Sequence, residues 1–509
     1  MRLDSLSRRS FLRTSTLTSA ALLLGQPGRS QQCNFAPPFL ITIGAPGGWD
    51  TTTTVDPHGV GEFSPYSPAD IISVGGLRVA PFDALAPVKP YMVRRFLRDE
   101  TGAIVRVANV NQTRQVDFFA ENASTIRVLN GVDNNTVGHA TGAHYSFTGH
   151  LREGMPCLGS LLAGALNSDA ALPFLSFGGV DASEGLVPGT RVNSSTGSIL
   201  RALGRPATNV GAPIVPAARE FIPRTVQEGI LAVQAARDAR RGQALLGRRA
   251  LLNAVRGHDA LSEGRLEGPS FESIANALDS VVSGADTNTL VSSISLALLC
   301  MRLTPTACHA AQLISGDFDS HVNINGMAAT GHRPQMKLIL EGIDFLIDEI
   351  ENNPANAAIK ERGMLVYVAS DFGRTRYNDE DGKDHWQITS SMIIGLGAMA
   401  QKVDGGTVLG QTTPLIDGVV QPGLRAKPMR IDDNGRFVLA DSFTSDDPNF
   451  ATLKPGDVIA ALRQGLGLDC QPVGPGQSTV TERFPIPDVN PGIARALAAG
   501  INPLLKNVS

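Results

Sequence analysis

The chain is poor in aromatic residues, in paired cysteine motifs and in surplus positive charge. Aromatic residues make up 5% of its 509 residues, and two of them are tryptophan, which is too few for a platform on which nucleic-acid bases stack. The formal net charge is −4, so no general basic surface favours a nucleic-acid partner. The five cysteines form no CxxC pair, which argues against a structural zinc cluster. We therefore expect no nucleic acid among the partners.

Long apolar runs are also missing, and none is predicted to span a membrane. The apolar stretch at residues 17–24 is short and follows Arg8-Arg9 in the pattern of a twin-arginine leader. The alternative is a chance arginine pair ahead of a short helix. We predict a signal peptide over residues 1–32, recognition by the twin-arginine export machinery, and a periplasmic or secreted protein. In that oxidising compartment Cys300 and Cys308 could bridge, or remain buried small apolar residues.

Short apolar runs alternate with helical patterns along most of the chain. Strands are predicted at residues 39–44, 125–132, 174–177, 311–315, 363–369 and 391–396, and helices at 155–166 and 335–350. Strands that alternate with helices favour a mostly parallel sheet covered on both faces. The predicted fold class is therefore α/β, with a mostly parallel central sheet and helices on both of its faces.

The pattern changes in the middle and at the end of the chain. We predict a first part of the α/β core at 37–192, a helix-rich insertion at 193–300, a second part of the core at 301–420, and a loop-rich C-terminal region at 421–509. Predicted helices in the insertion cover residues 226–255, 271–282 and 290–301, and terminal helices cover 458–466 and 492–499. The chain is long enough for one large unit with insertions or for two units.

Four segments combine carboxylates or histidines with turn-forming residues, each just after a predicted strand. They are residues 47–51, 134–139, 316–321 and 370–375, the last followed by Asp384 and His385. In parallel α/β sheets ligands bind beyond the carboxyl ends of the strands, so we expect the four segments to share one edge. Carboxylate and imidazole groups suit zinc, manganese, magnesium or calcium. A divalent metal site is therefore predicted at this edge.

Two features refine this prediction. Asp319 and His321 are two residues apart, so on an extended segment they share a face and can reach one ion. Arg374 offers a planar fork suited to a bidentate oxyanion. A lone aspartate after a strand, such as Asp50, is also a common helix cap or turn former.

These residues resemble the DUF1501 family, which comprises twin-arginine-exported bacterial proteins assigned to the alkaline-phosphatase-like superfamily. The matching pieces are the leader, residues 48–50 with Asp56-Pro57, residues 318–321 and 370–375, and Asp384-His385. The likeness covers residues 39–410 with gaps. It implies an alkaline-phosphatase-like core in which two metals, often zinc or manganese, flank a Ser, Thr or Cys nucleophile. It also implies hydrolysis or transfer of phosphate or sulfate esters.

The resemblance implies roles for particular residues. Metal ligands by this analogy are Asp50 and Asp371 at one ion, and Asp319, His321 and His385 at the other, with Asp384 beside them. Residues 134–139 resemble the nucleophile loop of cofactor-independent phosphoglycerate mutases, in which the nucleophile is a serine. Asn135 occupies that position here, which leaves the hydroxyls of Thr136 and Thr51 as the alternatives. Arg374 and His139 complete the predicted catalytic set.

Two functions follow as hypotheses. The first is an exported metal-dependent hydrolase of phosphate or sulfate esters, acting on a small anionic ester or on one carried by a polymer. The second is a non-catalytic metal- or anion-binding envelope protein. The second is favoured by Asn135 in place of the nucleophile and by Phe372 in place of the superfamily's histidine after Asp371.

Overall fold

The computed structural model describes the chain between residues 37 and 506, with gaps. The described residues are 37–80, 114–166, 170, 172–187, 189–192, 289–302, 308–326, 331–432, 436–445, 447, 449–469, 471 and 479–506. The unit that contains them runs from Ala36 to Ser509. The predicted signal peptide at 1–32, the predicted helices at 226–255 and 271–282, Cys33 and Cys470 lie outside the described residues.

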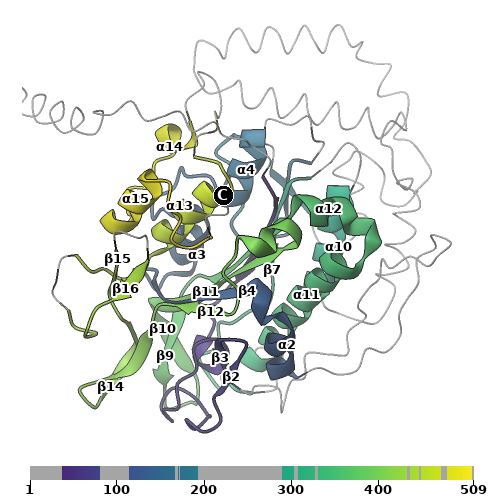
Figure 1. Cartoon of the computed structure of the whole chain (residues 1–509). Helices are drawn as coiled ribbons and strands as arrows, with labels where there is room; N and C mark the ends of the chain where they lie inside the picture. The colour runs from purple at the N-terminus through teal and green to yellow at the C-terminus, as the bar shows by residue number, and fades with distance from the viewer. Residues whose placement is uncertain are drawn as a thin grey trace, which may run out of the picture. The chain divides into compact units, whose positions relative to one another are not determined.

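An eight-stranded sheet forms the centre of the described structure (Figure 1), in the order β12-β4-β11-β8-β1-β7-β5-β6. Its strands are β1 Phe39–Ala45, β4 Ile126–Asp133, β5 Phe174–Ser176, β6 Gly189–Arg191, β7 Ala310–Ile314, β8 Met364–Ser370, β11 Ile388–Leu396 and β12 Thr407–Leu409. Strand β11 pairs antiparallel with β4 and β8, and the other neighbours pair in parallel. The prediction of a mostly parallel α/β sheet is confirmed. The carboxyl ends of the parallel strands and the amino end of β11 therefore lie at one edge.

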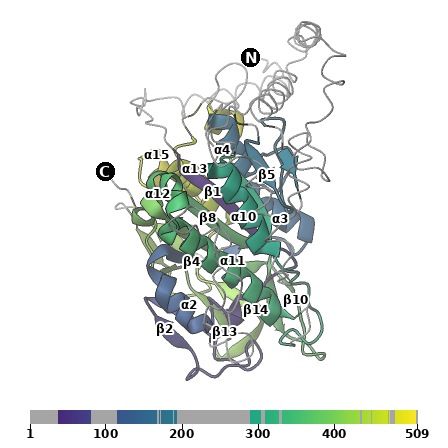
Figure 2. The same cartoon turned by 90° about the vertical axis from the view of Figure 1, so that its right-hand side faces the viewer.

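Helices cover both faces of this sheet (Figure 2). On one face lie α2 Gln115–Asn122, α10 Thr289–Arg302, α11 His332–Asn352 and α12 Ala357–Arg362; on the other lie α3 His139–Thr148, α4 Leu158–Leu166, α13 Pro455–Gly465, α14 Val480–Arg483 and α15 Pro491–Ala498. Strand β1 shows the division, because successive side chains point to opposite faces. Ile41 and Ile43 share one apolar cluster with α10 and α11, whereas Gly44 faces Phe147 of α3.

The burial of each element explains why its pattern of apolar residues indicated a strand or a helix. Strands β1, β8 and β11 are buried along their whole length, as expected for strands covered on both faces. Helix α11 is amphipathic, and its apolar stripe belongs to the same core cluster as α10. Helix α10, predicted as the last helix of the insertion, thus packs in the α/β core. None of the described helices is long and apolar enough to cross a membrane.

A second, antiparallel sheet lies beside the predicted site, in the order β10-β9-β14-β13. It consists of β9 Gly373–Tyr377, β10 Lys383–Trp386, β13 Thr412–Ile416 and β14 Val419–Ala426. The smaller elements are the hairpins β2 Ile72–Val74 with β3 Leu77–Val79 and β15 Met429–Ile431 with β16 Phe437–Leu439, and the short helices η1 Thr51–Thr53, η3 Ala123–Thr125, η4 Pro354–Asn356 and η5 Gly397–Gln401. The region predicted as loop-rich after residue 420 therefore contains strands. They are short and partly exposed, so they carry little apolar alternation.

Three described cysteines are free thiols in the interior. Cys157, Cys300 and Cys308 are all buried and unbridged, so the possible disulfide between Cys300 and Cys308 is not formed. Burial raises the pKa of Cys157 to about 11 and that of Cys300 to about 12. These thiols are therefore protonated near neutral pH and act as small apolar residues.

Helix α3 approaches the end of β8 so closely that Gly142 has no room for a side chain. A Cβ at Gly142 would lie 2.1 Å from the backbone oxygen of Asp371. We predict that Gly142→Ala lowers the free energy of unfolding by about 2 kcal/mol, although alanine usually stabilises a helix. Urea denaturation measures the change, with Gly61→Ala as control because a Cβ there meets nothing within 4 Å. Equal unfolding midpoints for the two variants would contradict the close contact.

Candidate functional site

The four predicted segments meet at one edge of the central sheet. They follow β1, β4, β7 and β8, whose carboxyl ends lie together. His385 joins them from β10, directly ahead of β11, because the reversed strand β11 begins at this edge. The loops are also tied directly, since the backbone N–H of Phe318 donates to the carbonyl of Pro46 at 2.8 Å. The sheet topology thus brings together residues that are far apart in the chain, such as Gly47 and Asp371, which are separated by 324 positions.

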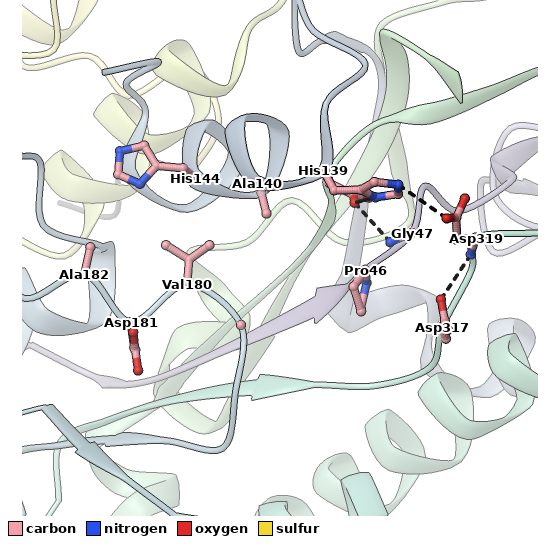
Figure 3. A pocket seen from close by; sticks show the side chains of 13 residues that line it. Pro46, Gly47, His139, Ala140, His144, Val180, Asp181, Ala182, Asp317 and Asp319 are labelled. Carbon is pink, nitrogen blue, oxygen red and sulfur yellow. Dashed lines mark hydrogen bonds and ion pairs between the residues drawn. The ribbon is translucent and has the colours of Figure 1, made fainter. Parts of the chain in front are cut away.

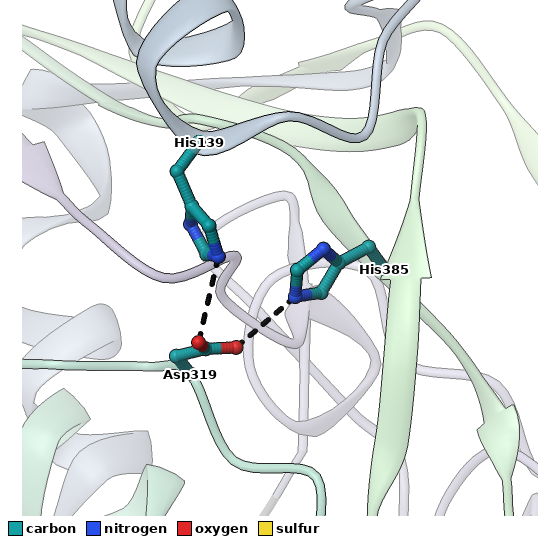
Figure 4. Close-up of side chains that lie close together, drawn as sticks. All are labelled: His139, Asp319 and His385. Carbon is teal, nitrogen blue, oxygen red and sulfur yellow. Dashed lines mark hydrogen bonds and ion pairs between the residues drawn. The ribbon is translucent and has the colours of Figure 1, made fainter.

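His139, Asp319 and His385 bring ligand atoms within 4.8 Å of one another (Figure 4). Asp319 Oδ1 lies 3.1 Å from His385 Nε2 and 3.0 Å from His321 Nε2. His139 Nε2 lies 3.4 Å from Asp319 Oδ2, and the Nε2 atoms of His321 and His385 are 3.1 Å apart. We call His139, Asp319, His321 and His385 the histidine cluster. Three of its members, His139, Asp319 and His385, are a possible metal-binding group.

The other ring nitrogen of each histidine is held by an acceptor. His139 Nδ1 lies 2.7 Å from Asp371 Oδ2, and His321 Nδ1 lies 2.9 Å from Asp384 Oδ1. His385 Nδ1 lies 3.0 Å from the carbonyl oxygen of Val137, which can only accept a hydrogen bond. These partners favour a proton on Nδ1 in all three rings, which leaves each Nε2 with a bare lone pair. Histidine ligands of metals are oriented in this way by carboxylates and backbone carbonyls.

Bare lone pairs this close require a cation between them. Three imidazole nitrogens and the Asp319 carboxylate would otherwise repel one another, so the cluster binds either protons or a metal ion. In tetrahedral zinc sites with bonds of about 2.0–2.1 Å, neighbouring ligand atoms are about 3.3 Å apart. The distances of 3.0–3.1 Å among Asp319 Oδ1, His321 Nε2 and His385 Nε2 are close to that value. The donor set and its geometry therefore fit a small divalent ion.

The electrostatics of Asp319 keep it available as a ligand. Partial burial opposes ionisation, but the interaction with His385 and the hydrogen bond and charge of Arg374 lower the pKa of Asp319 to about 2. Asp319 is therefore a carboxylate throughout the neutral pH range. Its side chain keeps 38% of its exposure, so the cluster is open to solvent on one side.

Arg374 does not offer the free fork that the sequence predicted for an oxyanion. Its side chain is fully buried, and its Nε and Nη1 donate to the carbonyls of Gly48 and Lys383 at 2.7 and 2.9 Å. Its Nη2 contacts the carbonyls of Gly47 and Phe318 and lies 3.0 Å from Asp319 Oδ1. The guanidinium therefore joins the loops after β1 and β7 to the start of β10 and orients Asp319.

Asp371 lies beneath the cluster as a buried carboxylate with four donors. Its Oδ1 accepts from Gly48 N at 2.6 Å and Ser370 Oγ at 2.9 Å, and its Oδ2 accepts from Gly47 N at 3.0 Å and contacts His139. Gly47 and Gly48 have φ angles of 98° and 82°, and a Cβ at Gly48 would lie 2.3 Å from the Phe372 ring. Asp371, predicted as a metal ligand, therefore anchors His139 and the glycine loop. Asp384 likewise anchors His321.

Asp50 also differs from its predicted role as a metal ligand. Its Oδ2 lies 2.6 Å from Lys383 Nζ, and its Oδ1 accepts from the backbone and hydroxyl of Thr52 at the start of η1. Burial is the largest influence and opposes ionisation, but the neighbouring charges, Lys383 first, and the hydrogen bonds from Lys383 and Thr52 together outweigh it, so the pKa of Asp50 lies below its usual value. Asp50 is a helix cap in a buried ion pair. Lys383 was missed in the sequence because a lone lysine gives no signal of burial.

The two predicted nucleophiles are not placed among these ligand atoms. Thr136 Oγ1 accepts from Gly138 N at 3.2 Å within its own loop, and Thr51 is buried in η1. Asn135, at the position of the resembled serine, is exposed with a φ of 52°. Among the described residues, therefore, no hydrogen bond joins the hydroxyl of Thr136 or of Thr51 to Asp319.

A pocket of about 670 Å³ opens beside the histidine cluster (Figure 3). Its described lining residues are Pro46, Gly47, His139, Ala140, Ala143, His144, Gly179, Val180, Asp181, Ala182, Asp317, Asp319 and Asp371. His139 and Asp319 stand at one end, and His144, Asp181 and Ala182 at the other. Pockets of this size hold small organic ligands. A ligand here would have one end against the cluster.

The fold and the site thus describe an α/β protein with a histidine-rich, possible metal-binding group at the carboxyl edge of its sheet. Residues 277–427 match the profile of a family described as "Protein of unknown function (DUF1501)". The match contains Asp319, His321, Asp371, Arg374, Asp384 and His385 and supports the family resemblance seen in the sequence. No curated protein matches the chain.

The two carboxylates that anchor histidines differ in burial, which predicts unequal effects on metal affinity. Asp371→Asn should weaken zinc binding by about 10- to 100-fold, because it loosens His139 and the glycine loop. Asp384→Asn should weaken zinc binding by less than about threefold, because the Asp384 side chain is 63% exposed and solvent replaces its contact. Competition with a chromophoric chelator measures both affinities, and circular dichroism confirms folding. Equal losses in the two variants would rule out the anchoring role of Asp371.

The buried pair of Lys383 and Asp50 predicts a non-additive effect on stability. Lys383→Met should lower the free energy of unfolding by about 3–5 kcal/mol, because it leaves the Asp50 carboxylate buried without its counter-ion. Adding Asp50→Asn should restore part of this loss, since the uncompensated charge is then removed. Urea denaturation of both single variants and the double variant tests the coupling. Additive losses would show that the two side chains do not interact.

Proposed function

We propose that this protein is a metal-dependent hydrolase with one divalent ion at the histidine cluster. The observation that carries the proposal is the shared orientation of His139, His321 and His385. Each ring has its Nδ1 fixed by an acceptor and its Nε2 directed at Asp319. Proteins orient metal-binding histidines in this way, with the second ring nitrogen held by a carboxylate or a backbone carbonyl. Here three histidines are each held by a different acceptor.

The donor set favours zinc. Imidazole nitrogen suits zinc, whereas magnesium and calcium prefer oxygen donors, and the cluster has three imidazoles to one carboxylate. Manganese is the second choice among the metals that the resemblance implies. One ion fits better than two, because Asp50 and Asp371 are already occupied by donors from the chain itself.

A bound ion supplies Lewis-acid chemistry, polarising an ester oxygen and making water a stronger nucleophile near neutral pH. The chain's own residues provide the geometry. Asp371 holds His139, Arg374 holds Asp319, and the pocket holds the substrate beside them. Water is the proposed nucleophile, since neither Thr136 nor Thr51 contacts Asp319 in the described structure.

The proposed substrates are phosphate or sulfate esters, small or carried by a polymer, as the family resemblance implies. The oxygen of water bonds to phosphorus or sulfur, the bond to the leaving alcohol oxygen breaks, and that oxygen takes up a proton. We further propose that the alkaline-phosphatase-like fold and export by the twin-arginine machinery to the periplasm or outside the cell apply to this chain.

A second candidate, a non-catalytic metal-binding envelope protein, is favoured by the position of His321. Its Nε2 is as close to Asp319 and His385 as a fourth ligand would be. Four protein ligands close a zinc site, whereas three leave a position for water or substrate. The number of protein ligands therefore separates the two candidates.

Elemental analysis of the purified exported protein, with assays on aryl phosphate and aryl sulfate esters, tests the proposal. We expect about one zinc per chain and turnover of at least one ester class. His385→Ala should lose both. His150→Ala is the matched control, because the ring of His150 hydrogen-bonds to the backbone of Arg152 and is not part of the histidine cluster.

A protein that retains zinc but hydrolyses no ester would support the closed, non-catalytic site. Absence of any divalent metal from the folded protein, before and after incubation with zinc, would overturn both candidates.

A further inference from the structure

We infer that the pocket beside the histidine cluster takes a monoanionic ester that also carries a positively charged group close to the ester. The inference rests on the proposed hydrolase function and specifies its substrate class. It excludes dianionic phosphate monoesters as the preferred substrate. Its basis is the charge on the described residues that line or directly contact the pocket.

Four carboxylates line the pocket, those of Asp181, Asp317, Asp319 and Asp371, and none of the described lining residues is lysine or arginine. Two arginines lie just outside it. Arg191 pairs with Asp181, with Nη2 2.7 Å from Oδ1, and buried Arg374 pairs with Asp319. A divalent ion together with these two guanidiniums would balance the four carboxylates. No positive charge is then left over for a ligand.

This balance decides between classes of ester. A phosphate monoester carries close to two negative charges near pH 7, because its second pKa is about 6, whereas a phosphate diester or a sulfate ester carries one. Placing a second negative charge in a partly enclosed pocket without a free cation costs more than placing one. Arg374 cannot turn to meet it, since its guanidinium is committed to Asp319 and to loop carbonyls. The pocket therefore favours the monoanion.

Asp317, which lies beside Asp319 at the cluster end of the pocket, supplies the preference for a positive charge on the ligand close to its ester group. Its Oδ1 accepts the backbone N–H of Asp319 at 3.3 Å, and its side chain lines the pocket (Figure 3). No ion pair joins it to any cation in the part of the chain that is described. Ala140, Ala143 and Gly179 are small, so the walls leave room for a compact cationic group. A quaternary ammonium or an amine matches this chemistry.

The kinetic test compares three nitrophenyl esters with the zinc-loaded protein at low salt. They are p-nitrophenyl phosphorylcholine, ethyl p-nitrophenyl phosphate and p-nitrophenyl phosphate. We expect kcat/KM to be highest for the choline ester, roughly fivefold lower for the ethyl diester, which lacks the cationic group, and lowest for the monoester. Asp317→Asn should reduce the difference in kcat/KM between the choline ester and the ethyl diester. Asp417→Asn, on the exposed turn between β13 and β14, should not.

Binding without turnover gives a second readout. Calorimetric titration of the metal-free protein with glycerophosphocholine and with inorganic phosphate should show tighter binding of glycerophosphocholine, and Asp317→Asn should narrow the difference. A monoester hydrolysed as well as the diesters, or a ratio that Asp317→Asn leaves unchanged, overturns the inference while the hydrolase function stands. Absence of turnover with all three esters and with aryl sulfate overturns the hydrolase function itself.

Discussion

The carboxylate of Asp371 is the constraint on which the site depends. It lies at the end of β8, buried, and accepts hydrogen bonds from the backbone of Gly47 and Gly48 while it contacts the ring of His139. A buried charge is stable only when donors surround it, so these segments must stay together once β8 is in place. The same contact sets the tautomer of His139 and thereby exposes its Nε2. The geometry of the cluster follows from this buried interaction.

Two buried cations hold the remaining loops around it. Arg374 joins the loops that follow β1 and β7 and orients Asp319, while Lys383 pairs with Asp50 and fixes the start of β10 next to His385. Neither cation is left free to meet a ligand. The positive charges of Arg374 and Lys383 therefore stabilise the loops. A ligand in the pocket contacts carboxylates and imidazoles. This division of roles supports the proposal of a metal ion, and not an arginine, as the electrophile.

Much of the fold could be predicted because its signals are local. The apolar runs that became β1, β8 and β11 are buried on both faces, and the amphipathic pattern of α11 is long and regular. The short strands around β14 were missed because buried, partly buried and exposed residues follow one another there without a regular period. Of the site, the shared edge could be predicted, since parallel strands place their carboxyl ends together.

The sequence by itself determined that histidines and aspartates would gather at one edge of a mostly parallel sheet, because strands that alternate with helices favour parallel pairing, which places their carboxyl ends together. Only the tertiary structure decided which of them face one another. Asp319 is a candidate ligand, Asp371 and Asp384 are anchors, and Asp50 is half of an ion pair. An aspartate carboxylate can act as a metal ligand, as an anchor for a histidine or as half of an ion pair. Which part it plays depends on contacts of about 3 Å between loops that are distant in the chain, and no local pattern encodes such contacts.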